Sequence, residues 1–255
     1  GKLLLQYSGQ SNMKRVSLET GGKTPNVIFA DAPDMDFAVG AVGFSIFWNT
    51  GEMCLAGSRL LVEQAAYDQV VARLEDVAAD WLPGDPLDPA TKAGPVVDAE
   101  QLSRVTGYID IGIDEGARLV TGGGRALEET GGFFVEPTVF SGVDNSMRIA
   151  REEIFGPVLS VIPFADEDEA LRIANDTSFG LAAAVWTSNL ARAHTMARGL
   201  QAGTVWVNNF DQADISAPFG GFKQSGFGGK DKSLWAIEKY TNLKTTWINL
   251  GRGGR

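Results

Sequence analysis

The stretch NVIFADAPDMDFAVGAVGFSIFWNTGEMCLAGSRLLVE, residues 26–63, alternates between two kinds of segment. NVIFA (26–30) and RLLVE (59–63) are short apolar runs of the length expected for buried strands. Between them, residues 36–49 are apolar nearly all round, which predicts a helix buried on several sides and capped by Asp34 or Asp36. A strand, a helix and a second strand in this order predict that the two strands pair in parallel.

The same rhythm continues along the chain. Further helices are expected over residues 65–81, 98–115, 167–175, 190–200 and 231–240. Further strands are expected in ARLVTGG (117–123), FFVEPTVF (133–140), VLSVIPF (158–164), AAVWT (183–187), GTVWVNN (203–209) and KTTWIN (244–249). The sequence therefore predicts an α/β fold built on a parallel sheet.

Composition and charge exclude several classes of protein. The chain has 255 residues, of which 44% are hydrophobic and 21% charged, enough to bury a core in one large or two smaller domains. Its 22 Lys and Arg against 32 Asp and Glu give a net charge of −10, which repels phosphate backbones and anionic lipids. The longest largely apolar run, residues 38–48, is shorter than the ~18 residues of a membrane-spanning helix. Partners among nucleic acids and membranes are therefore not expected.

The chain contains one cysteine and one histidine. A single cysteine excludes an intrachain disulfide and suits a reducing compartment, so the cytoplasm is the expected location. A single histidine, His194, excludes a multi-histidine metal site, and no metal is predicted.

Cys54 is a candidate nucleophile because of its place in the chain. It lies between the apolar helix and the next strand, with Gly51 and Gly57 leaving backbone room on either side. Ligands gather at such junctions in α/β proteins, which favours an accessible, reactive thiol. The alternative is a small buried hydrophobic residue, which is how lone cysteines usually behave and which composition alone favours.

Two acidic positions also allow chemistry. Glu19 stands where a strand ends at the Gly21-Gly22 pair, so its carboxylate is either a movable general base or an ordinary solvated acid. Glu152 and Glu153, in REEIFGPV, either terminate a short helix or offer a carboxylate that holds a sugar diol beside an aromatic residue. The sequence contains no Walker loop and no G-x-G-x-x-G turn after a strand.

Six segments occur in a fixed order: LETGGKTPNVIF, FWNTGEMCLAGSR, REEIFGPV, NDTSFGLAAAVWT, AGTVWVNN and PFGGFKQSG. Together they resemble the aldehyde dehydrogenase superfamily, over residues 1–250. Within it, SNMKRV and DKSLWAIEKYTNLKTTWI look most like the dehydrogenases of γ-glutamyl-γ-aminobutyraldehyde and similar ω-amino aldehydes.

The resemblance implies a role for each of several residues. Cys54 would be the nucleophile and Glu19 the general base. The nicotinamide end of NAD or NADP, with NAD favoured, would be held by Glu153, Phe155, Gln101 and Gly21. The substrate pocket would be lined by Trp48, Met53, Leu55, Asn208 and Phe219. In the implied reaction Cys54 forms a thiohemiacetal, hydride leaves for the cofactor, and Glu19 activates the water that hydrolyses the thioester.

The resemblance also implies a domain plan with a doubly wound sheet in the catalytic domain. Its parts are the tail of a coenzyme-binding domain (1–22), the catalytic domain (23–224), a segment returning to the coenzyme domain (225–240), an oligomerisation strand (241–250) and a flexible tail (251–255). The parent enzyme would be a homo-oligomer, a dimer or tetramer. Complete members are much longer and carry most of the coenzyme domain upstream, so two alternatives stay open: a non-catalytic fragment or paralogue, and a cofactor-independent esterase.

Several positions depart from the family pattern, among them Thr20, Met53 and the two described next. Glu52 adds a negative charge close to Cys54, which should raise the pKa of the thiol unless the carboxylate points away or is paired. Lys230 takes the position where an arginine is usual.

Overall fold

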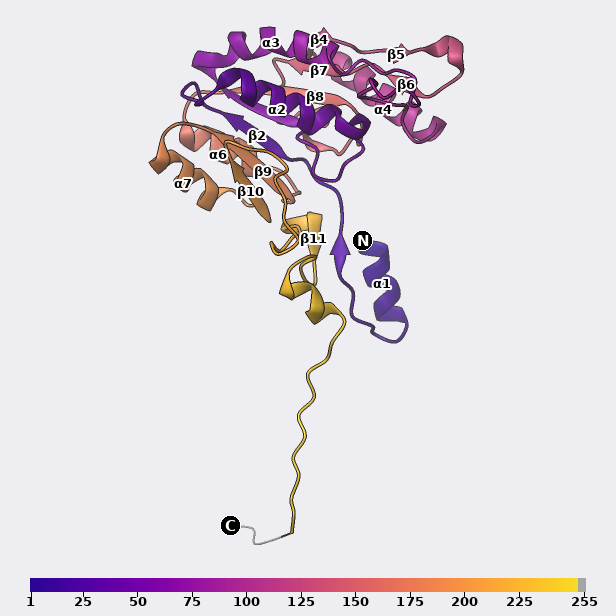
Figure 1. Ribbon diagram of the computed structural model, residues 1–255, viewed down its shortest axis with the longest axis vertical. Coiled ribbons are helices and arrows are strands. Elements are labelled where there is room, and N and C mark those ends of the chain that lie inside the picture. The colour runs from indigo at the N-terminus through magenta and orange to yellow at the C-terminus, as the bar shows by residue number, and fades with distance from the viewer. Residues whose placement is uncertain (252–255) are drawn as a thin grey trace.

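A seven-stranded sheet forms the body of the computed structural model, which describes residues 1–251 (Figure 1). In spatial order its strands are β10 (Thr204–Val207), β9 (Ala182–Trp186), β2 (Pro25–Ile28), β3 (Arg59–Glu63), β8 (Val158–Phe164), β7 (Thr138–Ser141) and β4 (Arg118–Thr121). All neighbouring strands are parallel except β4 and β7, which are antiparallel. The predicted α/β fold with parallel strands is confirmed.

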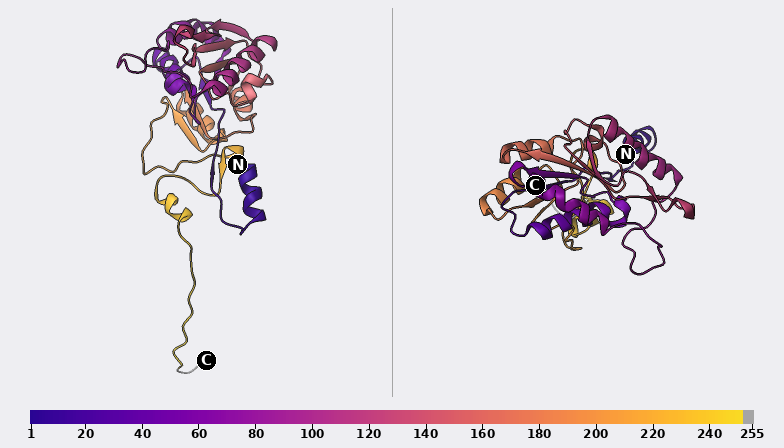
Figure 2. Two further views of the ribbon diagram at one scale, coloured as in Figure 1. Left: turned by 90° about the vertical axis from the view of Figure 1, so that its right-hand side faces the viewer. Right: turned by 90° about the horizontal axis from the view of Figure 1, so that it is seen from above.

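Helices cover both faces of this sheet, as the view from above shows (Figure 2). On one face pack α2 (Met35–Phe47) and α3 (Tyr67–Ala79). On the other pack α4 (Ala99–Asp114), α5 (Arg148–Arg151), α6 (Glu167–Asn175) and α7 (Leu190–Gly199). Neighbouring strand residues alternate between the two cores, with Val27 in one and Ile28 in the other. Burial on both faces is why the strands read as continuous apolar runs.

Helix α2 leads directly to the region of Cys54. The Asp34 carboxylate accepts a hydrogen bond from the Phe37 N–H at 2.9 Å and so caps its N-terminus, as the sequence predicted. Beyond Phe47 the chain tightens into a 3-10 turn, Trp48–Gly51, in which Asn49, Thr50 and Gly51 have left-handed backbone angles. This turn ends the helix and redirects the chain toward Cys54.

Two smaller elements lie outside the main sheet. Below it in Figure 1, β1 (Leu18–Glu19) pairs antiparallel with β11 (Gly226–Phe227) beside α1 (Lys2–Gln10), a helix that the sequence analysis did not predict. The second is a short antiparallel hairpin of β5 (Arg125–Ala126) and β6 (Phe134–Val135).

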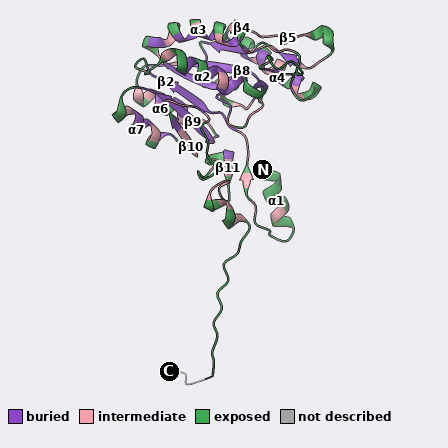
Figure 3. Cartoon of the chain, in the orientation of Figure 1, coloured by how far each residue is buried: buried purple, intermediate pink, exposed green. Residues whose placement is uncertain are grey.

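The C-terminal segment differs from the prediction. Residues 231–240 form only a 3-10 helix, Leu234–Lys239, and residues 241–250 form no strand. They run outward as an exposed chain (Figure 3), with Trp247 93% exposed, and pair with no strand of the described chain. Their role in oligomerisation stays a prediction. Of the predicted flexible tail 251–255, residues 252–255 lie outside the described residues.

Candidate active site

The Gly21-Gly22 turn brings two of the predicted site residues together. It connects Glu19, at the end of β1, to the buried start of β2. A Cβ atom on Gly21 would overlap the Glu153 carboxylate, and one on Gly22 would overlap the carbonyl oxygen of Cys54. Gly22 has no room for a side chain because the clash there is with backbone, whereas a side chain on Gly21 would meet the movable end of Glu153. This turn therefore contacts the Cys54 loop and the Glu153 side chain at once.

Cys54 is exposed, so the alternative of a buried structural cysteine does not hold. Partial burial of the sulfur nevertheless raises the pKa of its thiol above the ordinary value, and the negative charges of Glu19 and Glu153 raise it further. The N–H groups of Cys54 and Leu55 act in the opposite direction. The thiol is therefore reachable but mainly protonated at neutral pH, and its reaction depends on a base.

The carboxylate of Glu19 lies against the glycine-rich loop at 220–221. A Cβ on Gly220 would stand 2.8 Å from Glu19 Oε1, and the Gly221 N–H donates to the same carboxylate. Burial raises the pKa of Glu19, while the charges of Lys230 and Lys239 lower it. Lys230 Nζ also donates to the Gly220 carbonyl at 2.6 Å, which holds this cation beside the acid. A carboxyl with a raised pKa suits a general base.

The neighbouring residues Glu152 and Glu153 behave in opposite ways. Glu153 accepts a hydrogen bond from the Gly22 N–H at 3.1 Å, and burial raises its pKa. Glu152 instead accepts two hydrogen bonds from Arg148, both 3.0 Å, and one from the Tyr108 hydroxyl at 2.7 Å. These bonds lower the pKa of Glu152 to about 2. Glu153 therefore faces the site, and Glu152 is tied into the surface of α4 and α5.

Phe155 lies at the edge of the site in a strained conformation. Its φ of 61° is in the left-handed region, an outlier for an aromatic residue, and it is 37% exposed. The Gln101 amide nitrogen donates to the Phe155 carbonyl at 2.5 Å. Gln101 thus has its amide N–H engaged with the backbone, so the predicted contact with a ribose would have to use its amide oxygen.

The five predicted pocket residues make different contacts within the described chain. Met53 and Leu55 pack partly against the core on the α2 side, and Trp48 stacks near Phe44 at 6.1 Å between ring centroids. Asn208 uses both ends of its amide on Thr187: its oxygen accepts from the Thr187 N–H at 2.9 Å and its nitrogen donates to the Thr187 carbonyl at 3.0 Å. Asn208 is therefore a brace between the ends of β9 and β10, and the structure does not show it as a free pocket group.

Phe219 lies farther along the loop that follows β10. Its backbone exchanges two hydrogen bonds of 2.7 Å with Asp231, and the Lys232 ammonium lies 5.4 Å from its ring centroid. This pairing holds the loop next to the Gly220 segment that contacts Glu19.

Glu52 does not raise the pKa of the Cys54 thiol, because its carboxylate is engaged elsewhere. Its Oε1 atom accepts a hydrogen bond from the Val97 N–H at 3.2 Å. The acidic groups that raise the pKa of Cys54 are Glu19 and Glu153, and Glu52 is not among them. The exception stated for a paired carboxylate therefore applies.

A cavity of about 610 Å³ opens beside Glu153 and Gly21, bounded by α1, β1 and β11. Its size and the Glu153 carboxylate on its wall fit the nicotinamide ribose of a dinucleotide, whereas Phe155 is not among the residues that line it. No group of three or more His, Cys, Asp or Glu side chains within residues 1–251 could hold a metal ion. Across the same part of the chain, none of the helices has the length and hydrophobicity to span a bilayer.

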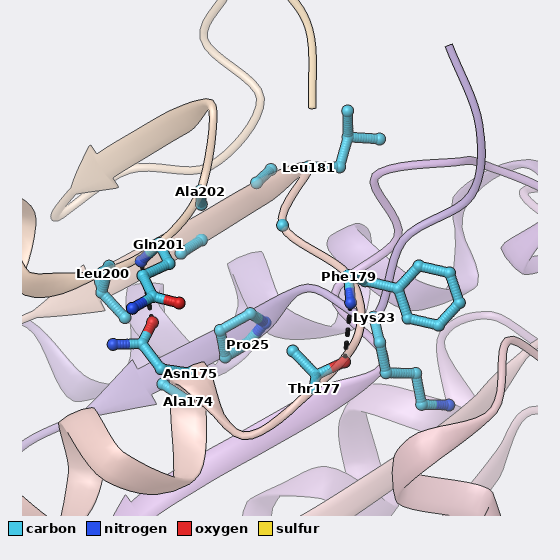
Figure 4. Close-up of a pocket in the computed structure, with 13 residues that line it drawn as sticks. Lys23, Pro25, Ala174, Asn175, Thr177, Phe179, Leu181, Leu200, Gln201 and Ala202 are labelled. Atoms are coloured by element: carbon cyan, nitrogen blue, oxygen red, sulfur yellow. Dashed lines mark hydrogen bonds between the residues drawn. The ribbon is translucent and has the colours of Figure 1, made fainter. Parts of the chain in front are cut away.

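Lys23, next to this turn, is a buried amine that sequence reasoning missed. It borders a small enclosed cavity of about 10 Å³, with its side chain directed away from Asn175 and Gln201 (Figure 4). Its Nζ makes no hydrogen bond within the described residues. Burial, with the positive charge of Arg59, lowers its pKa to about 7, while Glu153 and Glu152 act in the opposite direction.

Replacing Lys23 with methionine is expected to change how stability depends on pH. The unfolded chain protonates this amine below pH 10.5, but the folded chain does so only below about 7. The wild-type protein therefore loses stability as the pH falls from 10.5 toward 7, and Lys23→Met removes that loss. We compare the free energy of unfolding of the variant with that of wild type at each pH. We expect this difference to favour the variant by at least about 1 kcal/mol more at neutral pH than at alkaline pH.

Urea unfolding at the two pH values measures this gain. Lys92→Met, at an exposed lysine, is the matched control and should follow wild type. Parallel stability curves for Lys23→Met and wild type would contradict the expectation.

Comparison with known proteins identifies close relatives. The model described as "Aldehyde dehydrogenase family" matches residues 1–246. "NADP/NAD-dependent aldehyde dehydrogenase PuuC" of Escherichia coli (strain K12) is 50% identical over 98% of this chain and 50% of its own. The crystal structure of the aldehyde dehydrogenase KauB from Pseudomonas aeruginosa superposes with a TM-score of 0.95 at 60% identity, covering 98% of this chain and 50% of that one.

A third relative is similar at the same level. The γ-glutamyl-γ-aminobutyraldehyde dehydrogenase from Burkholderia cenocepacia J2315 has a TM-score of 0.93 at 58% identity, over 96% of this chain and 49% of its own. This chain spans about half the length of the relatives it matches.

Proposed function

Because this chain belongs to the aldehyde dehydrogenase family, we propose that it carries the reactive groups of an enzyme that oxidises an aldehyde to a carboxylic acid with NAD or NADP. The observation that supports this most directly is the Gly21-Gly22 turn, which contacts Glu153 and the Cys54 loop directly after Glu19. The proposed nucleophile Cys54, the proposed base Glu19 and the Glu153 carboxylate, which suits a ribose, thus lie close to Gly21 and Gly22.

In the proposed reaction Cys54 Sγ attacks the aldehyde carbon, and its proton passes to a base as the thiohemiacetal forms. The Cys54 backbone N–H donates to the oxygen that becomes negatively charged. Glu153 would hold the ribose diol and Phe155 would lie against the nicotinamide. When bound, the nicotinamide accepts the hydride whose loss leaves a thioester on Cys54.

Glu19 completes the cycle. It takes a proton from water as the water oxygen attacks the thioester carbon. The bond from carbon to Sγ breaks, the carboxylic acid leaves, and the thiolate regains a proton. The raised pKa of Glu19 keeps the carboxyl basic enough for this step, so hydrolysis should accelerate as the pH rises through that pKa.

The proposed substrates are aldehydes with an amino or γ-glutamylamino group at the far end, supported by the identity with the relative of that name. We favour NAD as cofactor, the cytoplasm as location and a homo-oligomer of the complete enzyme, the last supported by the unpaired segment 241–250.

A second candidate is a cofactor-independent esterase, favoured by the exposed thiol and by the presence of both Cys54 and Glu19 in this chain. The two activities are separated by measuring reduced-cofactor formation and hydrolysis of an activated ester on one sample. Cofactor reduction with aldehyde supports the dehydrogenase, ester turnover without it supports the esterase, and absence of both contradicts both proposals for this chain.

Replacing Glu19 with glutamine is expected to slow ester hydrolysis about 100-fold, because the water-activating base is lost while the nucleophile remains. Acylation of Cys54 continues because loss of the Glu19 charge lowers the pKa of the thiol, so a burst of product equal to the enzyme concentration should precede the slow phase. Stopped-flow measurement of the released alcohol tests this.

Glu75→Gln, at an exposed acid on α3, is the matched control and should turn over as wild type does. Loss of the burst together with the steady rate would contradict the assignment of Glu19 to deacylation.

A further inference from the structure

The turn before Cys54 is strained in a way that its sequence does not require. Asn49, Thr50 and Gly51 have φ values of 50°, 57° and 72°. This region costs a residue with a side chain about 1–2 kcal/mol, and a β-branched residue such as threonine is rare there. Strain of this kind persists only where surrounding contacts hold it, and it gathers at functional sites.

Two hydrogen bonds hold the turn from the same neighbouring segment. Thr50 is only 4% exposed, and its hydroxyl donates to the Gly94 carbonyl at 3.2 Å. Two residues later, Glu52 Oε1 accepts from the Val97 N–H at 3.2 Å. The strained turn is therefore fastened to residues 94–97 on both sides of Gly51.

The opposite side of the turn is fitted against the Phe155 segment. Gly51 lies so close that a Cβ there would overlap the backbone of Gly156 and Pro157. Neither side of the turn has room to move without breaking a contact.

The segment 94–97 leads directly into α4, which holds the other half of the site. Asp98 caps this helix by accepting from the Gln101 N–H at 2.8 Å. One turn on, the Gln101 side chain donates to the Phe155 carbonyl and Arg104 donates to the Glu153 carbonyl, each at 2.5 Å. Residues 94–97 thus contact the turn before Cys54, and the first turns of α4, which follow them, contact the segment that carries Glu153 and Phe155.

We propose that Glu52 is a positioning residue, which with Thr50 fastens the turn before Cys54 to the start of α4 and so fixes the thiol relative to Glu153 and Phe155. The proposal rests on the proposed function only in taking Cys54 as the reacting group. Burial raises the pKa of Glu52 and the Val97 N–H lowers it, which agrees with a carboxylate drawn out of water by this contact.

A reciprocal pair of variants separates the hydrogen bond from the charge. Glu52→Gln keeps the length and the acceptor but removes the charge. Glu52→Asp keeps the charge but is one methylene too short to reach the Val97 N–H. Thr50→Val removes the second hydrogen bond and keeps the branched shape.

The primary readout is the rate of Cys54 alkylation by iodoacetamide as a function of pH, which needs neither cofactor nor turnover. Glu52→Asp and Thr50→Val release the turn, so the sulfur becomes more fully exposed to water and the alkylation midpoint moves down toward the ordinary thiol pKa, away from the influence of Glu19 and Glu153. We expect alkylation at neutral pH to accelerate about threefold to tenfold, and kcat to fall about tenfold with KM little changed.

Glu52→Gln should restore the wild-type alkylation profile. Glu136→Ala is the matched control, because it removes the same kind of bond, from the Gly124 N–H at 3.1 Å, in the distant β5–β6 hairpin. Circular dichroism checks that each variant is folded. If Glu52→Asp is unfolded, the alkylation profile of Thr50→Val tests the proposal instead.

The proposal is overturned if Glu52→Asp and Thr50→Val alkylate with the wild-type pH profile, or if Glu52→Gln behaves as Glu52→Asp does. A wild-type chain that is alkylated but never turns over would contradict the proposed function, and the alkylation profiles would still test Glu52.

Discussion

Replacing Cys54 with alanine is expected to lower both aldehyde oxidation and ester hydrolysis by about 10⁴-fold or more, as loss of a covalent nucleophile does in other enzymes. Cys54 is the only cysteine of the chain, and its thiol is exposed beside the Gly21-Gly22 turn. No second sulfur can replace it. The alanine keeps the backbone of the loop, so Glu19 and Glu153 stay in place and only the attacking atom is removed.

Intact mass after iodoacetamide treatment gives an independent measurement. The wild-type chain should gain one adduct and Cys54→Ala none. Cys54→Ser is the conservative comparison, since its hydroxyl fills the same space but stays protonated and unreactive at neutral pH. Retention of wild-type ester hydrolysis by Cys54→Ala would eliminate both proposed activities at this residue.

Replacing Arg59 with methionine is expected to lower the free energy of unfolding by about 3 kcal/mol or more. Arg59 is 0% exposed, and its guanidinium donates to the carbonyls of Lys23, Ile173 and Ala174 at 3.1, 3.0 and 2.8 Å. Two of these carbonyls belong to the last turn of α6, which a cation also stabilises through the helix dipole. Methionine fills the space but leaves the buried carbonyls of Lys23 and Ala174 without these donors, while the Ile173 carbonyl keeps a bond from the Asp176 N–H at 3.2 Å.

Urea unfolding at neutral pH measures this loss. Arg172→Met is the matched control. Arg172 lies on α6, the helix whose last carbonyls Arg59 contacts, and it is exposed and pairs with Glu169. It should change stability by less than about 1 kcal/mol. An equal decrease in the free energy of unfolding in the two variants would show that the buried hydrogen bonds of Arg59 stabilise the fold no more than a surface ion pair does.

The local elements of the fold were predictable because burial and periodicity act over short stretches. The bounds of β8 and α6 match the predicted ranges 158–164 and 167–175. Helix α1 was missed because its apolar residues stand mainly in one short run, residues 3–5, so no amphipathic spacing marks it. Residues 244–249 have the composition of a strand, but a strand also needs a partner, and a pattern within one segment cannot supply it.

The sequence predicted which residues of the candidate site react, and these assignments stay predictions, but it gave no sign of most contacts that support them. Motifs singled out Cys54 and Glu19, whereas the bond between Glu52 and Val97 joins residues 45 positions apart and leaves no local signal. Lys23 did carry a signal, because a lysine between a glycine pair and a buried apolar strand has little access to water. Which groups surround its amine depends on long-range packing.

The Gly21-Gly22 turn acts as a spacer between the Glu153 carboxylate and the loop of Cys54. On the Glu153 side its contact is a side-chain carboxylate, which can rotate away from an added methyl group, whereas on the Cys54 side its contact is a backbone carbonyl, which cannot. A methyl group on Gly22 would therefore act as a wedge against the loop that carries the thiol, and one on Gly21 would displace only the Glu153 carboxylate. The position of the thiol loop is thus sensitive to a single carbon atom at Gly22.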